Sequence, residues 1–128
     1  MATKKKTVLT IYEELGQEAG VSAVVELLYQ KVTDDPRIAP FFVGVDMEKQ
    51  IEKQKRFLSM VFGGPQNYTG RELAAAHAHL VHRGLDHQHV DALLENLGSA
   101  MKELGIRKAL VARILALTNS YREDVLSR

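Results

Sequence analysis

All five histidines of this 128-residue chain lie between residues 72 and 94, and helical spacing separates one of them from the rest. His77 falls on the apolar side of a predicted helix, whereas His79 and His82 are rotated about 100° or more away from it. An inward imidazole either hydrogen-bonds within the core or binds a metal or cofactor, and spacing alone leaves both interpretations open. The apolar side that His77 shares consists of Leu73, Ala74, Leu80 and Val81.

The other four histidines are interpreted more simply. His79, His82 and His87 are expected at solvated positions. His89 follows Asp86 by three residues, so it lies in the first turn of the next helix and caps or packs that turn. A zinc site on His79 and His82 is a competing hypothesis, because histidines three residues apart share a helix side, but no third ligand is obvious.

Two glutamines interrupt an apolar helix stripe earlier in the chain. Gln50 and Gln54 stand one turn apart where apolar residues are expected, and buried amides need hydrogen-bond partners. Either they lie at the stripe's edge and reach water, or they line a cavity that requires a few polar donors. Their position beside Phe57 and Leu58 favours the cavity, and Tyr29 from another helix could add a third donor. The stripe consists of Met47, Gln50, Ile51, Gln54, Phe57, Leu58 and Val61.

These residues must be positioned by helices, because the apolar period is helical throughout the chain, without strand-like alternation or internal repeats. We therefore predict an all-α domain. Thr10 and Glu13 have the spacing of a capping box, which begins a short helix that ends near Gly16. A second helix is expected over about 21–32, followed by a short helical turn over 36–42.

Further capping residues mark the later helices. Asp46 is expected to cap the long helix that carries the glutamines, and Thr69 repeats the capping-box spacing with Glu72 before the histidine segment. Asp86 is expected to cap a helix that runs to about residue 104. One continuous last helix is predicted over about 107–126, with an inward side of Leu110, Ile114, Leu117, Thr118 and Tyr121.

Length and composition restrict the class of protein. The chain fits one domain over residues 1–128, with 1–8 as a mobile tail. Seventeen basic and sixteen acidic residues give no charge excess that would draw it to nucleic acid or a membrane surface. Without cysteine there is no disulfide or thiolate metal site. No apolar run approaches the roughly 20 residues of a membrane span, and no signal peptide is evident, so we expect a soluble, cytoplasmic monomer.

Residues 11–126 resemble the group I truncated haemoglobins, small haem proteins with a shortened globin fold. The segments that carry the similarity are "IYEELG", "LLYQKVTDDPRIAPFF", "VDMEKQIEKQKRFLSMVFGGPQNYTGR", "AAAHAHLVHRGLDHQHVDALLENLGSAMKELGI" and "YREDVLSR". No single segment suffices, but their order and spacing together are specific. The resemblance implies an all-α, truncated globin-like two-over-two helical sandwich that encloses a haem.

The resemblance also assigns roles to the inward residues. In this family the histidine a few residues after the "YTGR"-like stretch is the proximal haem ligand, which is His77 here. The opposite side is expected to carry Tyr29, Gln50 and Gln54, whose hydrogen bonds suit bound O₂. Phe42 matches a corner phenylalanine against the haem face. The remaining expected cofactor contacts, which ordinary core packing would also explain, are Phe57, Leu58, Phe62, Leu73, Leu97 and Ile114.

Lys53 lies one turn from Gln50 and Phe57, at the border of the inward face. Some group I members carry at the matching position a histidine or lysine that binds iron when no gas is present. A lysine ligates only as the neutral amine, and deprotonation at pH 7 costs about 4 to 5 kcal/mol. The resemblance therefore implies a six-coordinate ferric haem with His77 and Lys53 as metal ligands. This six-coordination is expected to be lost on acidification. The alternative is a solvated lysine paired with a haem propionate.

Three departures from the family pattern stand out. Many members have Gly-Gly after the first helix, whereas Gly16 is followed here by Gln17. Some cyanobacterial relatives have a histidine before the terminal "R-x-D-V-L" stretch that attaches covalently to a haem vinyl group, and Tyr121 stands in that place. We therefore expect non-covalent haem b. Many members have a phenylalanine where this chain has Val90, and the smaller valine is expected to open space on the proximal side of the haem.

The leading hypothesis for function is a haem protein that binds O₂, NO and other diatomic gases. The resemblance adds nitric oxide dioxygenase capacity, in which O₂ and NO yield nitrate and an unidentified reductase restores the iron, so enzyme status stays open. An electron-transfer or redox-sensing haem protein is the alternative, because an internal sixth ligand obstructs gas binding. A haem-free helical interaction module is a third class, tested by reconstitution with haemin.

Overall fold

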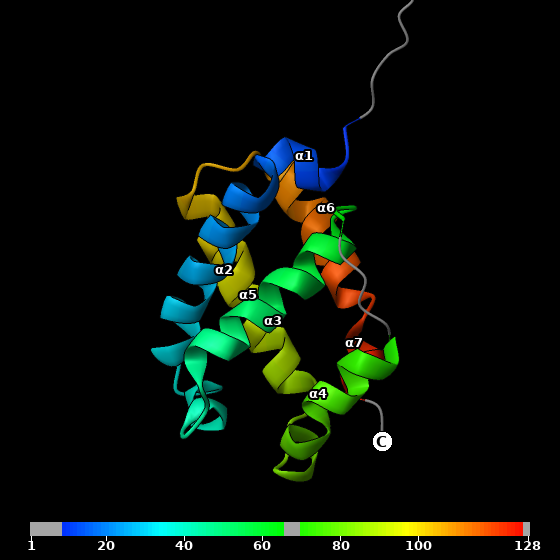
Figure 1. Ribbon diagram of the computed structural model, residues 1–128. Helices are drawn as coiled ribbons and strands as arrows, with labels where there is room; N and C mark the ends of the chain where they lie inside the picture. Colours follow the sequence, from blue (N-terminus) through cyan, green and yellow to red (C-terminus); the bar gives the residue numbers. More distant parts are fainter. Residues whose placement is uncertain (1–8, 66–69, 127–128) are drawn as a thin grey trace, which may run out of the picture.

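The computed structural model describes residues 9–65 and 70–126, and all regular structure in these two ranges is helical (Figure 1). The prediction of an all-α chain is confirmed. The elements, in chain order, are α1 (Ile11–Leu15), α2 (Gln17–Thr33), the 3₁₀ helix η1 (Ala39–Phe42), α3 (Met47–Val61), α4 (Gly70–His82), α5 (His87–Glu103), α6 (Lys108–Asn119) and α7 (Arg122–Val125).

The predicted caps at Thr10, Asp46 and Asp86 are confirmed, whereas the second helix begins at Gln17, before the predicted start at residue 21. Thr10 Oγ1 accepts the Glu13 backbone N–H at 3.0 Å, and the Glu13 carboxylate accepts the Thr10 N–H at 2.9 Å, which completes the capping box. Asp46 and Asp86 accept backbone N–H groups at the starts of α3 and α5. Thr69 and the predicted tail 1–8 lie outside the described residues.

The prediction of one continuous last helix is wrong. α6 ends at Asn119 and α7 begins at Arg122. Before the break, Thr118 donates its hydroxyl to the Ile114 carbonyl at 2.7 Å, and Ser120 donates its hydroxyl to the Leu117 carbonyl. Such side-chain bonds compete with the helical ladder. Leu117, expected to face inward, is 37% exposed.

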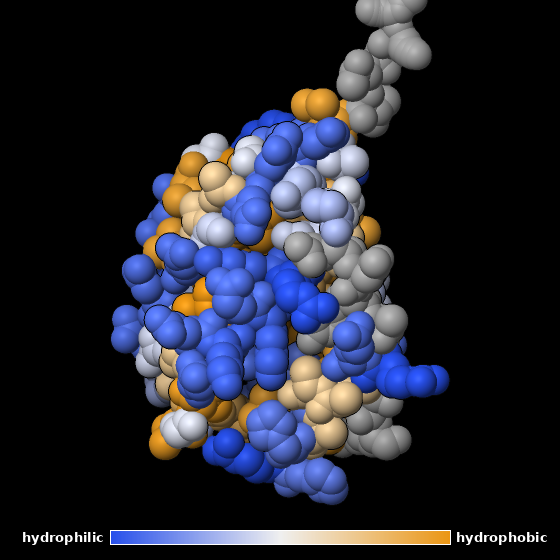
Figure 2. Space-filling model, in the orientation of Figure 1, coloured by the Kyte–Doolittle hydropathy of each residue, from blue (hydrophilic) through white to orange (hydrophobic). Residues whose placement is uncertain are grey.

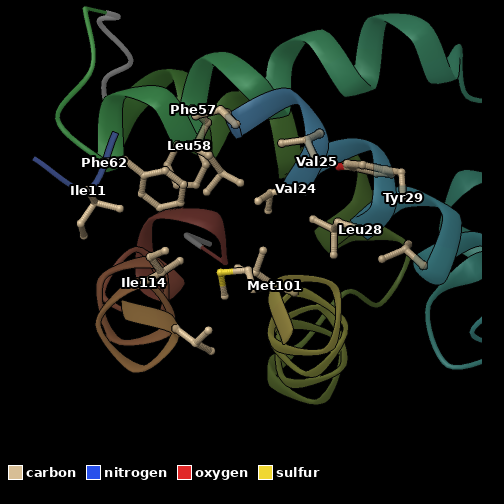
Figure 3. Close-up of a cluster of buried hydrophobic side chains, with 14 of the residues drawn as sticks. Ile11, Val24, Val25, Leu28, Tyr29, Phe57, Leu58, Phe62, Met101 and Ile114 are labelled. Atoms are coloured by element: carbon tan, nitrogen blue, oxygen red, sulfur yellow. The ribbon is translucent and has the colours of Figure 1, made fainter. Parts of the chain in front are cut away.

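The apolar core lies between α2, α3, α5 and α6 (Figure 3). Side chains of α2 and α3 meet on one side, and Met101 of α5 and Ile114 of α6 close the other. Each fully buried aliphatic or aromatic side chain contributes about 1.5 to 3 kcal/mol, so this four-helix contact stabilises the fold. The α2 and α3 residues labelled in Figure 3 are Val24, Val25, Leu28, Tyr29, Phe57 and Leu58.

Helix α4 is placed differently from the other long helices. Within the described residues its main packing partner is the short helix α7, and it makes no comparable contact with α2, α3 or α5. Figure 1 shows α4 and α7 side by side, with α3 crossing above them and α5 behind. Helix α4 therefore depends mainly on α7 for its packing within the described residues.

The outward side of α3 is hydrophilic, as Figure 2 shows for the face that this helix presents. Its exposed residues there include Glu48, Glu52, Lys53 and Arg56. None of the helices in the described ranges combines the length and apolar character needed to cross a membrane.

Candidate functional site

A cavity lies on the inner side of α4. Including its mouth and the open solvent there, the space between the lining atoms is about 760 Å³. Residues of α3 and α4 line it, together with the start of α5 and the segment around α7. Most of the lining is aliphatic or aromatic, and the polar exceptions are Tyr29, Gln50, Gln54, His77, His89, Thr118, Tyr121 and Arg122.

The geometry of His77 identifies the form of its ring. Nδ1 lies 2.9 Å from the Leu73 carbonyl oxygen. A carbonyl oxygen only accepts, so Nδ1 carries the proton and Nε2 carries the lone pair. Because His77 lines the cavity, Nε2 is the nitrogen available to a ligand there.

The electrostatic environment favours the neutral form of this imidazole. Burial lowers the pKa of His77 most, and the positive charges of His79 and Lys53 lower it further, while the hydrogen bond to Leu73 acts in the opposite direction. A neutral imidazole with a free lone pair is the form that ligates a metal. His77 therefore lines the cavity, as its predicted inward position requires, and its surroundings favour the neutral ring that metal ligation needs.

The hydrogen-bonding set predicted from α2 and α3 meets at one point of the cavity. Gln50 Nε2 donates to the Tyr29 hydroxyl at 3.3 Å, and that hydroxyl donates to Gln54 Oε1, also at 3.3 Å. Both bonds are longer than the common distances of about 2.7 to 3.0 Å, so they are weak. The ring of Phe42 packs edge-on against Tyr29, with centroids 5.6 Å apart.

His89 has the capping role that its spacing predicted. Its Nδ1 accepts the Asp86 backbone N–H at 2.9 Å, which completes a capping box at the start of α5. The ring also packs edge-on against Phe41, with centroids 4.7 Å apart. His89 therefore joins the start of α5 to η1 at the cavity wall.

The structure divides the predicted site residues into two groups. Those that line the cavity are Tyr29, Phe42, Gln50, Gln54, Phe57, Leu73 and His77. Four predicted wall residues do not line it and are instead packed in the core of Figure 3, where Leu58, Phe62 and Ile114 are labelled and Leu97 lies in the same cluster. Ordinary core packing, the alternative left open for them, describes their surroundings.

Lys53 is exposed and does not line the cavity. It immediately precedes Gln54 in α3, and its charge acts on His77.

The competing zinc hypothesis gains no third ligand, because residues 9–65 and 70–126 contain no group of three acidic or histidine side chains suited to a metal ion.

Several cavity residues were not predicted as site residues. On α5, Leu93 and Leu94 line the cavity together with Val90, while the predicted contact Leu97, one turn later, lies in the core. Tyr121 packs edge-on against Phe57 at 5.2 Å, and its hydroxyl donates to Met60 Sδ at 3.8 Å. The other unpredicted residues are Ile38, Phe41, Leu80, Leu85, His89, Thr118, Arg122 and Val125.

The donor set fits an iron porphyrin. The imidazole lone pair of His77 could ligate the iron, the apolar and aromatic wall would suit a macrocycle, and the hydroxyl and amides could donate hydrogen bonds to a small bound ligand. Comparisons with known proteins agree. A sequence model of the bacterial-like globins matches residues 10–127.

Among relatives, the chain is 39% identical over 119 residues to the group 1 truncated haemoglobin of Tetrahymena pyriformis, covering 93% of this chain and 96% of the relative. It is 40% identical over 122 residues to that of Synechocystis, covering 93% and 98%. The chain belongs to the group 1 truncated haemoglobins. It is a haem-binding, gas-binding globin, with iron porphyrin held non-covalently.

Solved structures of truncated haemoglobins show the same fold. The 2/2 haemoglobin of Synechococcus, in the cyanomet state with covalently attached haem, has a TM-score of 0.87 at 40% identity, covering 94% of this chain and all of that one. The Fe(III) form of the Tetrahymena pyriformis protein has a TM-score of 0.84 at 38% identity, with the same coverage. The predicted two-over-two globin fold is confirmed.

Proposed function

We propose that His77 ligates the haem iron, that Tyr29, Gln50 and Gln54 hold a diatomic gas on the opposite side, and that the protein oxidises nitric oxide to nitrate. The observation that carries this proposal is the His77 ring, whose Nδ1 donates to the Leu73 carbonyl and whose Nε2 lone pair is available in the same cavity that holds the hydroxyl and amide groups. Burial lowers the pKa of this ring, which favours the neutral form that ligation needs. When bound, haem supplies a coordination position for the gas and a one-electron couple.

The role of His77 follows from its fixed tautomer. The Leu73 carbonyl accepts the Nδ1 proton, which orients the ring and makes Nε2 a stronger donor of electron density. His77→Ala is expected to lose the Soret band and stoichiometric haem, whereas the exposed neighbour variant His79→Ala retains both. Absorption spectra and haem content of the purified variants test this, and an unchanged spectrum in His77→Ala would remove the proposal.

The polar set has the capacity to hold a ligand. The Tyr29 hydroxyl can leave its long bond to Gln54 and donate to a gas, while Gln50 Nε2 keeps that hydroxyl in place. The net reaction, NO + O₂ + one electron giving nitrate, is balanced by an electron from an external reductase. The largely apolar wall lowers the local dielectric constant, which would strengthen these hydrogen bonds.

Replacing the tyrosine hydroxyl measures its contribution. Tyr29→Phe is expected to speed O₂ dissociation on the order of tenfold, the effect of losing about 1 to 1.5 kcal/mol of hydrogen bonding. Tyr12→Phe in α1 is the matched control, since Tyr12 does not line the cavity. Stopped-flow O₂ displacement gives the rates, and equal rates in both variants would contradict a hydrogen-bonding role for Tyr29.

We further propose that Lys53 is the sixth ligand of ferric iron in the absence of gas. Its position next to Gln54 and its electrostatic effect on His77 support this, and its exposed side chain must turn inward to ligate. The six-coordinate ferric spectrum is expected to disappear on acidification and in Lys53→Ala, but not in Lys49→Ala. Identical spectra of wild type and Lys53→Ala across pH would exclude the lysine.

The electron-transfer alternative depends on this same lysine. Rapid displacement of Lys53 by O₂ or NO in the ferrous protein favours gas chemistry, and slow displacement with fast reduction favours electron transfer. Nitrate yield per ferric haem formed, measured on mixing the oxygenated protein with NO, tests the dioxygenase directly. A cytoplasmic, monomeric protein is part of the proposal, and cell fractionation and sedimentation measure both properties.

A further inference from the structure

The short helix α7 joins α4 to the rest of the molecule. α4 carries His77, yet α7 is its main packing partner in the described part of the chain. α7 spans only Arg122–Val125, and a single helical turn does not hold its place without tertiary contacts. The position of His77 therefore depends in part on what fastens α7, besides the contacts of Leu73 with the core and of Arg83 with Pro40.

Arg122 provides that fastening through three nitrogens of its guanidinium group. NH2 donates to Asp91 Oδ1 at 2.6 Å, and NH1 donates to the His87 carbonyl at 3.1 Å, so both bonds reach the start of α5. Nε donates to Asn119 Oδ1 at 2.9 Å, at the end of α6. One residue of α7 thus spans the break after α6 and holds the first turns of α5.

The Arg122 side chain is largely shielded from solvent at these bonds. The Arg122 side chain is 17% exposed, whereas Asp91 is 60% exposed. Low exposure of the cation reduces screening, and a planar guanidinium makes several directed bonds where an ammonium group cannot. Arg122 also lines the cavity, together with Tyr121 and Val125 of the same segment. Release of α7 would therefore displace a cavity wall and the helix that carries His77 at once.

We propose that Arg122 is a positioning residue for cofactor retention, which acts by fixing α7, and through it α4, to α5. This inference rests on haem occupying the cavity, as in the proposed function. It predicts that loss of the guanidinium accelerates haem release without removing the His77 ligand.

The test uses the full-length, haem-loaded protein and measures transfer of haemin to excess apomyoglobin by absorbance. Arg122→Met keeps the apolar stem and is expected to release haem on the order of tenfold faster, the effect of losing charge-assisted bonds. Arg122→Lys should restore part of the retention, and Asp91→Asn should have a smaller effect that adds nothing in the Arg122→Met background. The matched control is Arg113→Gln, a substitution at an exposed arginine of α6, which should release haem at the wild-type rate.

A second control separates positioning from general stability. Gln30→Gly lowers stability in α2, away from the α7 contacts, and should leave haem release near the wild-type rate. The inference is overturned if Arg122→Met releases haem like wild type, or if Gln30→Gly and Arg122→Met accelerate release equally. If Arg122→Met does not fold, the rates of haem release from Arg122→Lys and Asp91→Asn test the inference instead. Release at the wild-type rate from both variants would overturn it. Failure of the wild type to retain haem would instead contradict the proposed function.

Discussion

At Gln17 the backbone adopts a conformation that its side chain disfavours. Gly16 and Gln17 are both left-handed, with φ of 99° and 62°, where α1 turns into α2. The turn is so tight that a Cβ on Gly20 would lie 1.8 Å from the Leu15 carbonyl oxygen. A glycine suits position 16, but a residue with a Cβ is strained in the left-handed region. The absence of a second glycine therefore leaves the turn intact and places strain at Gln17.

Gln17→Gly is expected to stabilise the protein by about 1 kcal/mol, because it removes the left-handed strain. The thermal midpoint should rise by roughly 3 to 6 °C for a chain of this size. Gln30→Gly, at an exposed position inside α2, should have the opposite sign. Differential scanning calorimetry of both variants checks the prediction, and a lower midpoint for Gln17→Gly would contradict it.

Between elements, Asp35 ties the end of α2 to α5. Its carboxylate accepts the backbone N–H of Arg37 and two guanidinium nitrogens of the same residue, and it accepts Asn96 Nδ2 at 2.8 Å. Arg37 in turn donates to Glu95 at 3.0 Å. The Arg37 and Asn96 hydrogen bonds hold the pKa of Asp35 well below its usual range. This network positions η1, which carries the cavity residues Phe41 and Phe42.

Asp35→Asn is expected to lower stability near neutral pH, because an amide replaces a charged acceptor and points a donor at Arg37. The folded-state pKa is depressed, so the stabilisation is full above the unfolded value of about 3.9, declines progressively below it, and is lost only as pH falls through the depressed folded-state pKa. The wild type should therefore approach the variant in stability below about pH 4. Urea denaturation from pH 7 to pH 3 measures the difference, with Asp34→Asn as control. A pH-independent difference would show that the charge is not responsible.

Sequence patterns predicted which face of each helix turns inward, but not which turn of that face meets the cavity. The helical period placed His77, Gln50 and Gln54 correctly toward the interior, because it depends only on residues three and four apart. The same period cannot separate Leu93, at the cavity, from Leu97, in the core. That separation depends on where α2 and α6 pack against α5.

Long-range hydrogen bonds set the other limit to prediction. Arg122 reaches Asp91 and His87, which lie 31 and 35 residues away along the chain. No local pattern signals such a contact. The break between α6 and α7 was missed for a related reason, since Thr118 and Ser120 fit the helical period while their hydroxyls compete for its carbonyls.

For the whole molecule, the arrangement of contacts divides the fold into two parts. α2 packs with α1, α3 and α5, and α5 packs with α6, around the core of Figure 3. α4 and α7 pack mainly with each other across the cavity from that core. Parts with few buried contacts open at lower free energy than the global unfolding transition. A cofactor held in this cavity would therefore contact both parts.

Hydrogen exchange measured by mass spectrometry is expected to show this division. In the haem-free protein, peptides from residues 70–82 and 122–126 should exchange on the order of a hundredfold faster than those of α2 and α5, because their opening costs less free energy. Haem binds only the native arrangement, so loading should slow exchange in these two segments most, by an amount that follows the ligand's binding free energy. The core peptides around Leu28 and Met101 should be protected in both forms. Uniform slowing of exchange along the chain would show instead that α4 and α7 open only with the whole fold, and the two-part division would be wrong.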